Sequence, residues 1–219
     1  MKNKRIAVIL AGCGVYDGAE IHESVLTLLR LDQHGAEVKC FAPNISQMHV
    51  VDHLTGDESA SESRNVLVEA ARIARGEITD LEQANAEAFD GVIVPGGFGA
   101  AKNLCNFAVE GSGMVVNESF KCFIQAMHRA GKPVGLICIA PVMAGQLFGE
   151  GVECTIGNDT LTAEAIEEMG GHHKICEVGQ IHIDPIHKLV TTPAYMLAER
   201  ISEAATGINL LVDTILEMD

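Results

Sequence analysis

Short apolar runs alternate with amphipathic stretches from one end of this chain to the other. Five apolar runs predict β-strands, at residues 5–10, 37–42, 91–94, 133–138 and 188–191. Apolar residues at helical spacing predict helices at 21–34, 65–75, 80–88, 119–130, 141–148, 162–169 and 201–215. Apolar strands that are separated by helices are typical of a parallel sheet covered on both faces.

No linker or shift in composition divides the chain, so we expect one doubly wound α/β domain over residues 1–219. Residues 44–88 form an excursion from the simple alternation, and 44–63 within it lack any periodicity, which fits a surface loop or a hairpin. In a doubly wound sheet, ligands bind outside the carboxyl ends of the strands, near the point where the strand order reverses. The turns that follow the strands are therefore where functional residues are expected.

Charge and hydropathy narrow the class of protein. Fifteen lysines and arginines against thirty acidic residues give a formal charge of −15, which excludes a nucleic-acid partner on electrostatic grounds. No apolar stretch approaches the ~20 residues of a membrane span. The apolar run at 6–11 ends in Gly12-Cys13-Gly14 rather than at a signal-peptidase site. We therefore expect a soluble, cytoplasmic protein without a membrane partner.

The seven cysteines are scattered without a CxxC pair, which argues against a disulfide scaffold and against a structural zinc site. The histidines at 172, 173, 182 and 187 show no helical i, i+4 pairing, and no cysteine lies at ligand spacing from them. We therefore expect no bound metal.

The first turn, GCGVYDGAEIHE at 12–23, lacks the dinucleotide fingerprint because its third glycine falls at position 18 and Asp17 occupies position 17. We therefore expect no nucleotide cofactor. Asp17 and Glu20 are interpreted as acidic residues that meet the positive end of a helix dipole. Glu23 lies further into the predicted helix, and its role is left open between structure and chemistry.

Two further turns carry candidate chemistry. In VIVPGGFGAAKNL at 92–104, three glycines within four residues can turn backbone N–H groups toward a ligand. In GKPVGLICIAP at 131–141, an apolar strand runs into Cys138, and Pro141 suits the start of a helix. The positive end of the helix dipole lies close to a thiol at such an elbow, which predicts a lowered thiol pKa and a reactive thiolate. The alternative, a buried cysteine that ends a strand, is equally consistent with these residues.

Taken together, VILAGCG with Glu23, PGGFGAAKNL, ICIAP and LVTTPAYM resemble motifs of the ThiJ/PfpI superfamily, over nearly the whole chain. These are flavodoxin-like proteins related to class I glutamine amidotransferases. The resemblance implies a mostly parallel sheet with helices on both faces, and a homodimer as one expected assembly. Four motifs in the same order narrow the resemblance to the branch of enhancing lycopene biosynthesis proteins, which carries a link to isoprenoid biosynthesis.

The resemblance also implies roles for individual residues. Cys138 takes the position of the nucleophile, and Glu23 that of the carboxyl group hydrogen-bonded to it. Gly97 and Ile139 take the positions whose backbone N–H groups form an oxyanion hole. The excursion at 44–88 is longer than expected for small members of the superfamily, and it would cover or reshape the pocket.

The implied activity is that of a cofactor-free, glutathione-independent glyoxalase, a lyase that converts glyoxal to glycolate and whose activity could reflect protein deglycation. Its substrate is a small aldehyde, which Cys138 attacks to form a hemithioacetal, with Glu23 as the proton shuttle. A non-catalytic redox or stress-responsive protein would use the same reactive cysteine. A thiol hydrolase or amidotransferase-like enzyme is the other alternative.

The hydrolase alternative needs a histidine beside the nucleophile. The superfamily's two local positions for it are occupied by Ile139 and Asn158. A histidine would then have to come from elsewhere in the fold, with His22, His182 and His187 as the candidates.

Overall fold

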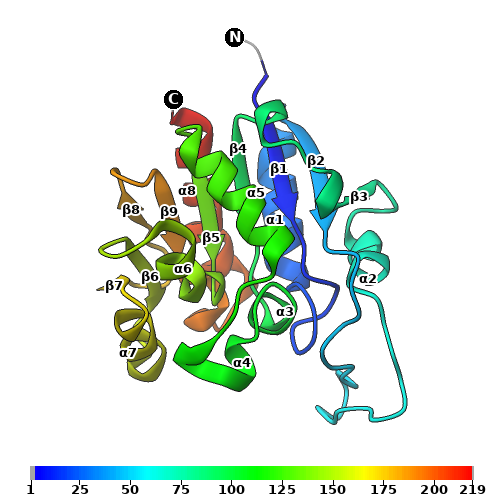
Figure 1. Ribbon diagram of the computed structural model, residues 1–219. Helices are drawn as coiled ribbons and strands as arrows, with labels where there is room; N and C mark the ends of the chain where they lie inside the picture. The colour runs from blue at the N-terminus through cyan, green and yellow to red at the C-terminus, as the bar shows by residue number, and fades with distance from the viewer. Residues whose placement is uncertain (1–2, 219) are drawn as a thin grey trace.

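The computed structural model describes residues 3–218 and is built around a seven-stranded sheet (Figure 1). The strands run in the spatial order β3-β2-β1-β4-β5-β9-β8. Six of them are parallel, and β8 pairs antiparallel with β9 at one edge. Their bounds are β1 (Arg5–Ile9), β2 (Glu37–Ala42), β3 (Ile78–Asp80), β4 (Gly91–Val94), β5 (Val134–Ile137), β8 (His182–Asp184) and β9 (Leu189–Thr192). The strand order reverses between β1 and β4, which confirms the expected flavodoxin-like, doubly wound α/β fold.

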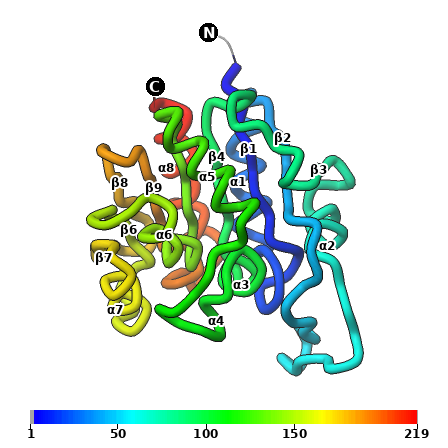
Figure 2. Tube along the Cα trace, in the orientation of Figure 1, coloured from blue at the N-terminus to red at the C-terminus, as the bar shows by residue number. Residues whose placement is uncertain are grey.

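Helices cover both faces of the sheet because successive residues of each buried strand point to opposite sides. On β1, Ile6 and Val8 pack against helices α1 (Ile21–Gln33), α2 (Val66–Ile73) and α8 (Ile201–Glu217). Ala7 and Ile9 instead join the core under α5 (Glu118–Arg129) and α6 (Ala144–Phe148). Figures 1 and 2 show α5 in front of the sheet, with α1 and α8 behind it.

Several short elements were not predicted from the sequence. Beside β9 lies a second, two-stranded parallel sheet, made of β6 (Glu153–Gly157) and β7 (His172–Ile175). Strands β7 and β8 are polar or partly exposed, so they lack the apolar runs that reveal a buried strand. Three further helices complete the fold, α3 (Phe98–Lys102), α4 (Phe107–Glu110) and α7 (Thr160–Glu168), and the last of these was expected at 162–169.

The predicted helix at 80–88 is wrong. The chain forms the edge strand β3 up to Asp80 and then two separate 3₁₀ turns, Leu81–Gln83 and Ala86–Ala88. The carboxyl group of Asp80 does accept the Glu82 N–H (3.1 Å), as a capping residue would. A new cap at Asn85 starts the second turn, so neither turn extends into an α-helix. The helix expected at 141–148 likewise begins as a 3₁₀ turn, Ala140–Met143, before α6.

The first part of the excursion, 44–63, is a long loop that projects from the end of β2 (Figure 2). Isolated antiparallel bridges, Ser46 to Asn65 and Val51 to Glu58, hold it together as an irregular hairpin. The second part returns to the body of the protein as α2 and β3. Among residues 3–218, no helix is long and apolar enough to cross a membrane.

Because β5 leads directly into Cys138, its packing supports the elbow that follows it. We expect Leu136→Ala, a change at a fully buried β5 side chain, to lower the free energy of unfolding by about 2–5 kcal/mol. Leu54→Ala removes the same atoms from a side chain that is 93% exposed, and it should cost less than about 0.5 kcal/mol. Urea denaturation of both variants measures the difference, and equal losses would contradict this account of the core.

Candidate functional site

The carboxyl ends of the central strands surround a cavity of about 360 Å³. The turn after β5 contributes Cys138, the turn after β4 contributes Gly97, and the segment after β9 contributes Tyr195. The walls are mostly apolar and include Val15, Phe98, Ala101, Phe107, Ile139 and Met196. This is the position that the doubly wound topology predicts for a ligand site.

Cys138 adopts a backbone conformation that L residues rarely take, with φ of +63°. A non-glycine residue in this region is strained by roughly 1–2 kcal/mol. The surrounding structure holds it there: the Cys138 N–H donates to the Thr192 carbonyl (2.9 Å), and the chain enters a 3₁₀ turn directly afterwards. The side chain is 7% exposed and faces the cavity, so the expected strand-to-helix elbow is present.

Glu23 lies beneath this thiol, in the first turn of α1, and is completely buried. Its Oε2 accepts the Gly96 N–H (2.8 Å), its Oε1 accepts the Tyr195 N–H (3.3 Å), and its carboxyl group is hydrogen-bonded to Cys138. Burial raises the pKa of Glu23 to about 7, with a further contribution from the negative charge of Glu20. The three hydrogen bonds oppose this shift.

The expectation of a lowered pKa for Cys138 is wrong. Burial raises the pKa of this thiol well above its ordinary value, and the charge and hydrogen bond of Glu23 raise it further. The backbone N–H groups of Gly97 and Ile139 act in the opposite direction, because both donate to the sulfur. Protonation of Glu23 removes the effect of its charge on the thiol pKa, whereas burial, the larger cause, remains.

The structure brings together all four residues that the sequence singled out, Cys138, Glu23, Gly97 and Ile139. The glycine loop has a steric reason to be glycine. A Cβ atom on Gly96 would lie 2.5 Å from the Cys138 Cβ and 3.0 Å from Oε2 of Glu23. Gly97 has φ of +86°, and a Cβ atom there would lie 2.5 Å from the Glu20 nitrogen. A side chain at position 96 would push the loop away from the thiol, and one at position 97 would push it away from the segment that leads into α1.

Asp17 and Glu20 were both expected to meet the positive end of a helix dipole, but their carboxyl groups make different contacts. Glu20 is the N-cap of α1, where its Oε2 accepts the Glu23 N–H (2.6 Å), and its side chain also lines the cavity. Asp17 lies before the helix and is buried; its Oδ2 accepts the Val51 N–H (2.8 Å) and fastens the excursion to the loop after β1. The positions of these two residues in the sequence did not predict either hydrogen bond.

Tyr195 is the cavity residue that sequence reasoning missed, although the motif TTPAYM contains it. Its backbone N–H holds Glu23, and its hydroxyl lies 2.7 Å from Nδ1 of His22. Asp159 and Thr162, at the start of α7, line another part of the wall. The amphipathic pattern of α7 predicted the helix, but it gave no indication that the first turn of this helix reaches the cavity.

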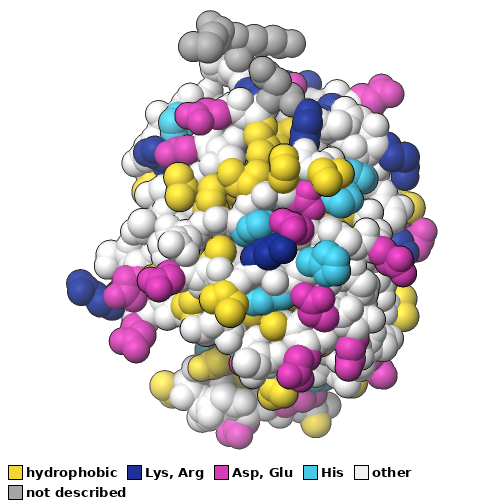
Figure 3. Space-filling model, turned by 90° about the vertical axis from the view of Figure 1, so that its left-hand side faces the viewer, with side chains coloured by type: hydrophobic (Ala, Val, Ile, Leu, Met, Phe, Trp, Pro, Cys, Tyr) yellow, Lys and Arg dark blue, Asp and Glu magenta, His cyan; other side chains and the backbone are white. Residues whose placement is uncertain are grey.

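The remaining histidines proposed for a triad lie elsewhere. His182 pairs with Glu153 (3.1 Å) and His187 with Asp184 (2.7 Å), on the side of the molecule that carries β7 and β8. Figure 3 shows histidines among acidic and basic side chains on that side. Within residues 3–218, no histidine is hydrogen-bonded to Cys138, and no group of three or more histidine, cysteine or acidic side chains is placed to hold a metal ion.

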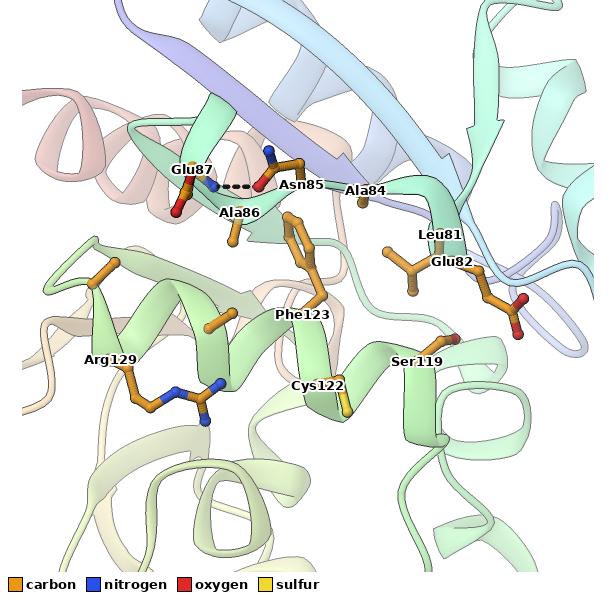
Figure 4. Close-up of a pocket in the computed structure, with 12 residues that line it drawn as sticks. Leu81, Glu82, Ala84, Asn85, Ala86, Glu87, Ser119, Cys122, Phe123 and Arg129 are labelled. Carbon is orange, nitrogen blue, oxygen red and sulfur yellow. Dashed lines mark hydrogen bonds between the residues drawn. The ribbon is translucent and has the colours of Figure 1, made fainter.

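A second and larger cavity, of about 760 Å³, lies between α5 and the 3₁₀ turns that follow β3 (Figure 4). Cys122, Phe123 and Arg129 from α5 contribute to its walls. Its cysteine is exposed, and a hydrogen bond to Glu118 raises the pKa of that thiol. This cavity contains neither the nucleophile candidate nor the buried carboxyl group, so it is not the candidate active site.

Known proteins resemble this chain over nearly its whole length. The chain is 48% identical to the human glutamine amidotransferase-like class 1 domain-containing protein 3, mitochondrial; the match spans 98% of this chain and 83% of that protein. It is 47% identical to the ES1 protein homolog, mitochondrial, of Rattus norvegicus, over 98% of this chain and 84% of the other. No protein-family model matches. The expected cytoplasmic location is contradicted, because these relatives are named mitochondrial.

Two solved structures are similar to this chain to different degrees. The crystal structure of an isoprenoid biosynthesis protein with an amidotransferase-like domain from Ehrlichia chaffeensis has a TM-score of 0.91 and 38% identity, and the match covers 98% of this chain and 99% of that one. A DJ-1 superfamily protein from Salmonella typhimurium shares the fold, with a TM-score of 0.56 at 21% identity over 92% of this chain and 84% of that one. The chain therefore belongs to the ES1 family of glutamine amidotransferase-like class 1 domain proteins.

Proposed function

We propose that this chain is a glutathione-independent glyoxalase that converts glyoxal to glycolate through a covalent adduct on Cys138. The observation that carries the proposal is the surroundings of the Cys138 sulfur. Glu23 is hydrogen-bonded to it on the buried side, and the N–H groups of Gly97 and Ile139 point at it beside the cavity. A nucleophile, a proton acceptor and two N–H donors are what addition to a carbonyl group requires.

In the first step, the sulfur adds to one aldehyde carbon of glyoxal. The thiol proton passes to the Glu23 carboxylate as the S–C bond forms, and Glu23 then gives it to the new alkoxide, which yields a hemithioacetal. The two N–H groups stabilise the negative charge on that oxygen while it lasts. Forming the thiolate next to a protonated Glu23 removes the like-charge repulsion that otherwise raises the thiol pKa.

In the second step, a base moves the hydrogen of the sulfur-bearing carbon to its neighbour through an enediolate, and the hydroxyl proton passes between the two oxygens. The product of this rearrangement is a thioester of glycolate. Water then cleaves the S–C bond, which restores the thiol and releases glycolate. One carbon is oxidised and the other reduced, so the reaction needs no external oxidant, nucleotide or metal.

The alternatives fit this site less well. A hydrolase of the amidotransferase type uses a histidine beside the nucleophile. The three candidate histidines, His22, His182 and His187, are instead hydrogen-bonded to Tyr195, Glu153 and Asp184, respectively. A redox sensor needs a thiol of low pKa, and the pKa of Cys138 is raised. As part of the same proposal we place the chain in the enhancing lycopene biosynthesis branch, in keeping with the name of the Ehrlichia chaffeensis protein.

The first prediction concerns the nucleophile. Cys138→Ala should lower glycolate formation from glyoxal by roughly 10³-fold or more, because no covalent adduct can form. Cys122→Ala, which removes an exposed thiol on α5, should leave the rate unchanged. Glycolate is measured without added glutathione or metal. Residual turnover near the wild-type rate in Cys138→Ala would rule out the proposed chemistry.

The second prediction concerns pH. Because the pKa of Glu23 is raised to about 7, this carboxyl group is protonated below that pH and cannot accept the thiol proton. We expect kcat/KM for glyoxal to rise as the pH increases through about 7. Glu23→Gln should lower kcat/KM by about 10²–10⁴-fold and remove this rise. A profile with the same rise in Glu23→Gln would assign it to another group.

A further inference from the structure

The cavity wall contains a second carboxyl group that the mechanism above does not use. Glu20 lies one helical turn before Glu23, is 8% exposed, and lines the cavity together with Cys138. Its backbone N–H donates to the Gly96 carbonyl (3.0 Å), which fixes it next to the loop that supplies the Gly97 N–H. The loop that contains Gly96 and Gly97 therefore also positions the Glu20 carboxyl group at the cavity surface.

Glu23 is less suited than Glu20 to reach the carbon atoms of a substrate. It is completely buried, and its two oxygens are occupied by the N–H groups of Gly96 and Tyr195 and by the thiol of Cys138. It is not among the residues that line the cavity, whereas Cys138 and Glu20 are. Glu20 uses only Oε2 for a hydrogen bond, to the Glu23 N–H, and no described residue bonds to its Oε1.

We propose that Glu20 is the catalytic base for the carbon-bound proton, a role that rests on the proposed glyoxalase function. Its carboxylate removes the proton from the sulfur-bearing carbon of the hemithioacetal, and the C–H electron pair forms the C=C bond of the enediolate. The same carboxyl group returns the proton to the neighbouring carbon, so that it ends the cycle ionised. Glu23 then handles only the proton that moves between sulfur and oxygen.

Asp159 is the other carboxyl group in the wall, and two observations favour Glu20 over it. Asp159 is exposed at the start of α7, where its Oδ1 accepts the Thr162 N–H (2.8 Å). Hydrogen bonds from Thr162 hold the pKa of Asp159 below its ordinary value, which makes it a weaker base. Glu20 instead lies between the Gly97 loop and Tyr195, whose pKa is raised by burial and by the charge of Glu20.

The test uses Glu20→Gln, because glutamine keeps an oxygen that can accept the Glu23 N–H but cannot act as a base. We expect kcat for glyoxal to fall by about 10²–10⁴-fold. The isotope effect on kcat with dideuterated glyoxal should become larger, since C–H cleavage then limits turnover. Protection of Cys138 by glyoxal against iodoacetamide, followed by mass spectrometry, should stay unchanged because hemithioacetal formation does not need Glu20.

Asn117→Ala is the control for a purely structural cap. It removes the N-cap of α5, where the Asn117 side chain accepts the Phe120 N–H (3.1 Å), and should lower the melting temperature by roughly 2–4 °C without altering the isotope effect. Wild-type kcat and isotope effect in Glu20→Gln would overturn the assignment of Glu20 alone. Loss of adduct formation in Glu20→Gln would also overturn it. A wild-type chain that makes no glycolate would instead overturn the glyoxalase proposal and this role with it.

Discussion

The hydrogen-bonded burial of the Glu23 carboxyl group is the constraint on which the site depends. A carboxyl group removed from water is costly unless its oxygens are satisfied. Here the N–H groups of Gly96 and Tyr195 and the thiol of Cys138 satisfy them, so that three turns from different strands converge on one side chain of α1. The same burial explains why Glu23 has a pKa of about 7, in the range that suits proton transfer at neutral pH.

The backbone segments around this carboxyl group pack so closely that positions 96 and 99 have room only for glycine. A Cβ atom on Gly96 would collide with the Cys138 Cβ, and one on Gly99 would collide with the Gly18 backbone and the Ala11 carbonyl. Close contact between backbones brings N–H groups within reach of the sulfur without side chains between them. The mostly apolar cavity wall provides a surrounding of low polarity, in which such donors act more strongly on a developing charge.

The sequence allowed the fold and the four residues around the thiol to be predicted, for physical reasons that are easy to trace. Buried strands such as β4 and β5 are continuous apolar runs, and the glycines after β4 mark a close approach. Strands β7 and β8 were not predicted, because they lie at sheet edges and carry polar side chains. The pKa of Cys138 was predicted in the wrong direction, since burial and an opposing carboxylate are tertiary effects that no local pattern reveals.

Two of the contacts that shape the surroundings of Cys138 come from a late part of the chain, at Thr192 and Tyr195. The Thr192 carbonyl accepts the Cys138 N–H and so holds its strained backbone, and the Tyr195 N–H holds Glu23. During synthesis on the ribosome, the thiol therefore lacks its final geometry until β9 has emerged and docked beside β5. A nascent or truncated chain that lacks β9 would carry Cys138 without these two contacts, so any chemistry of this thiol depends on the docking of β9.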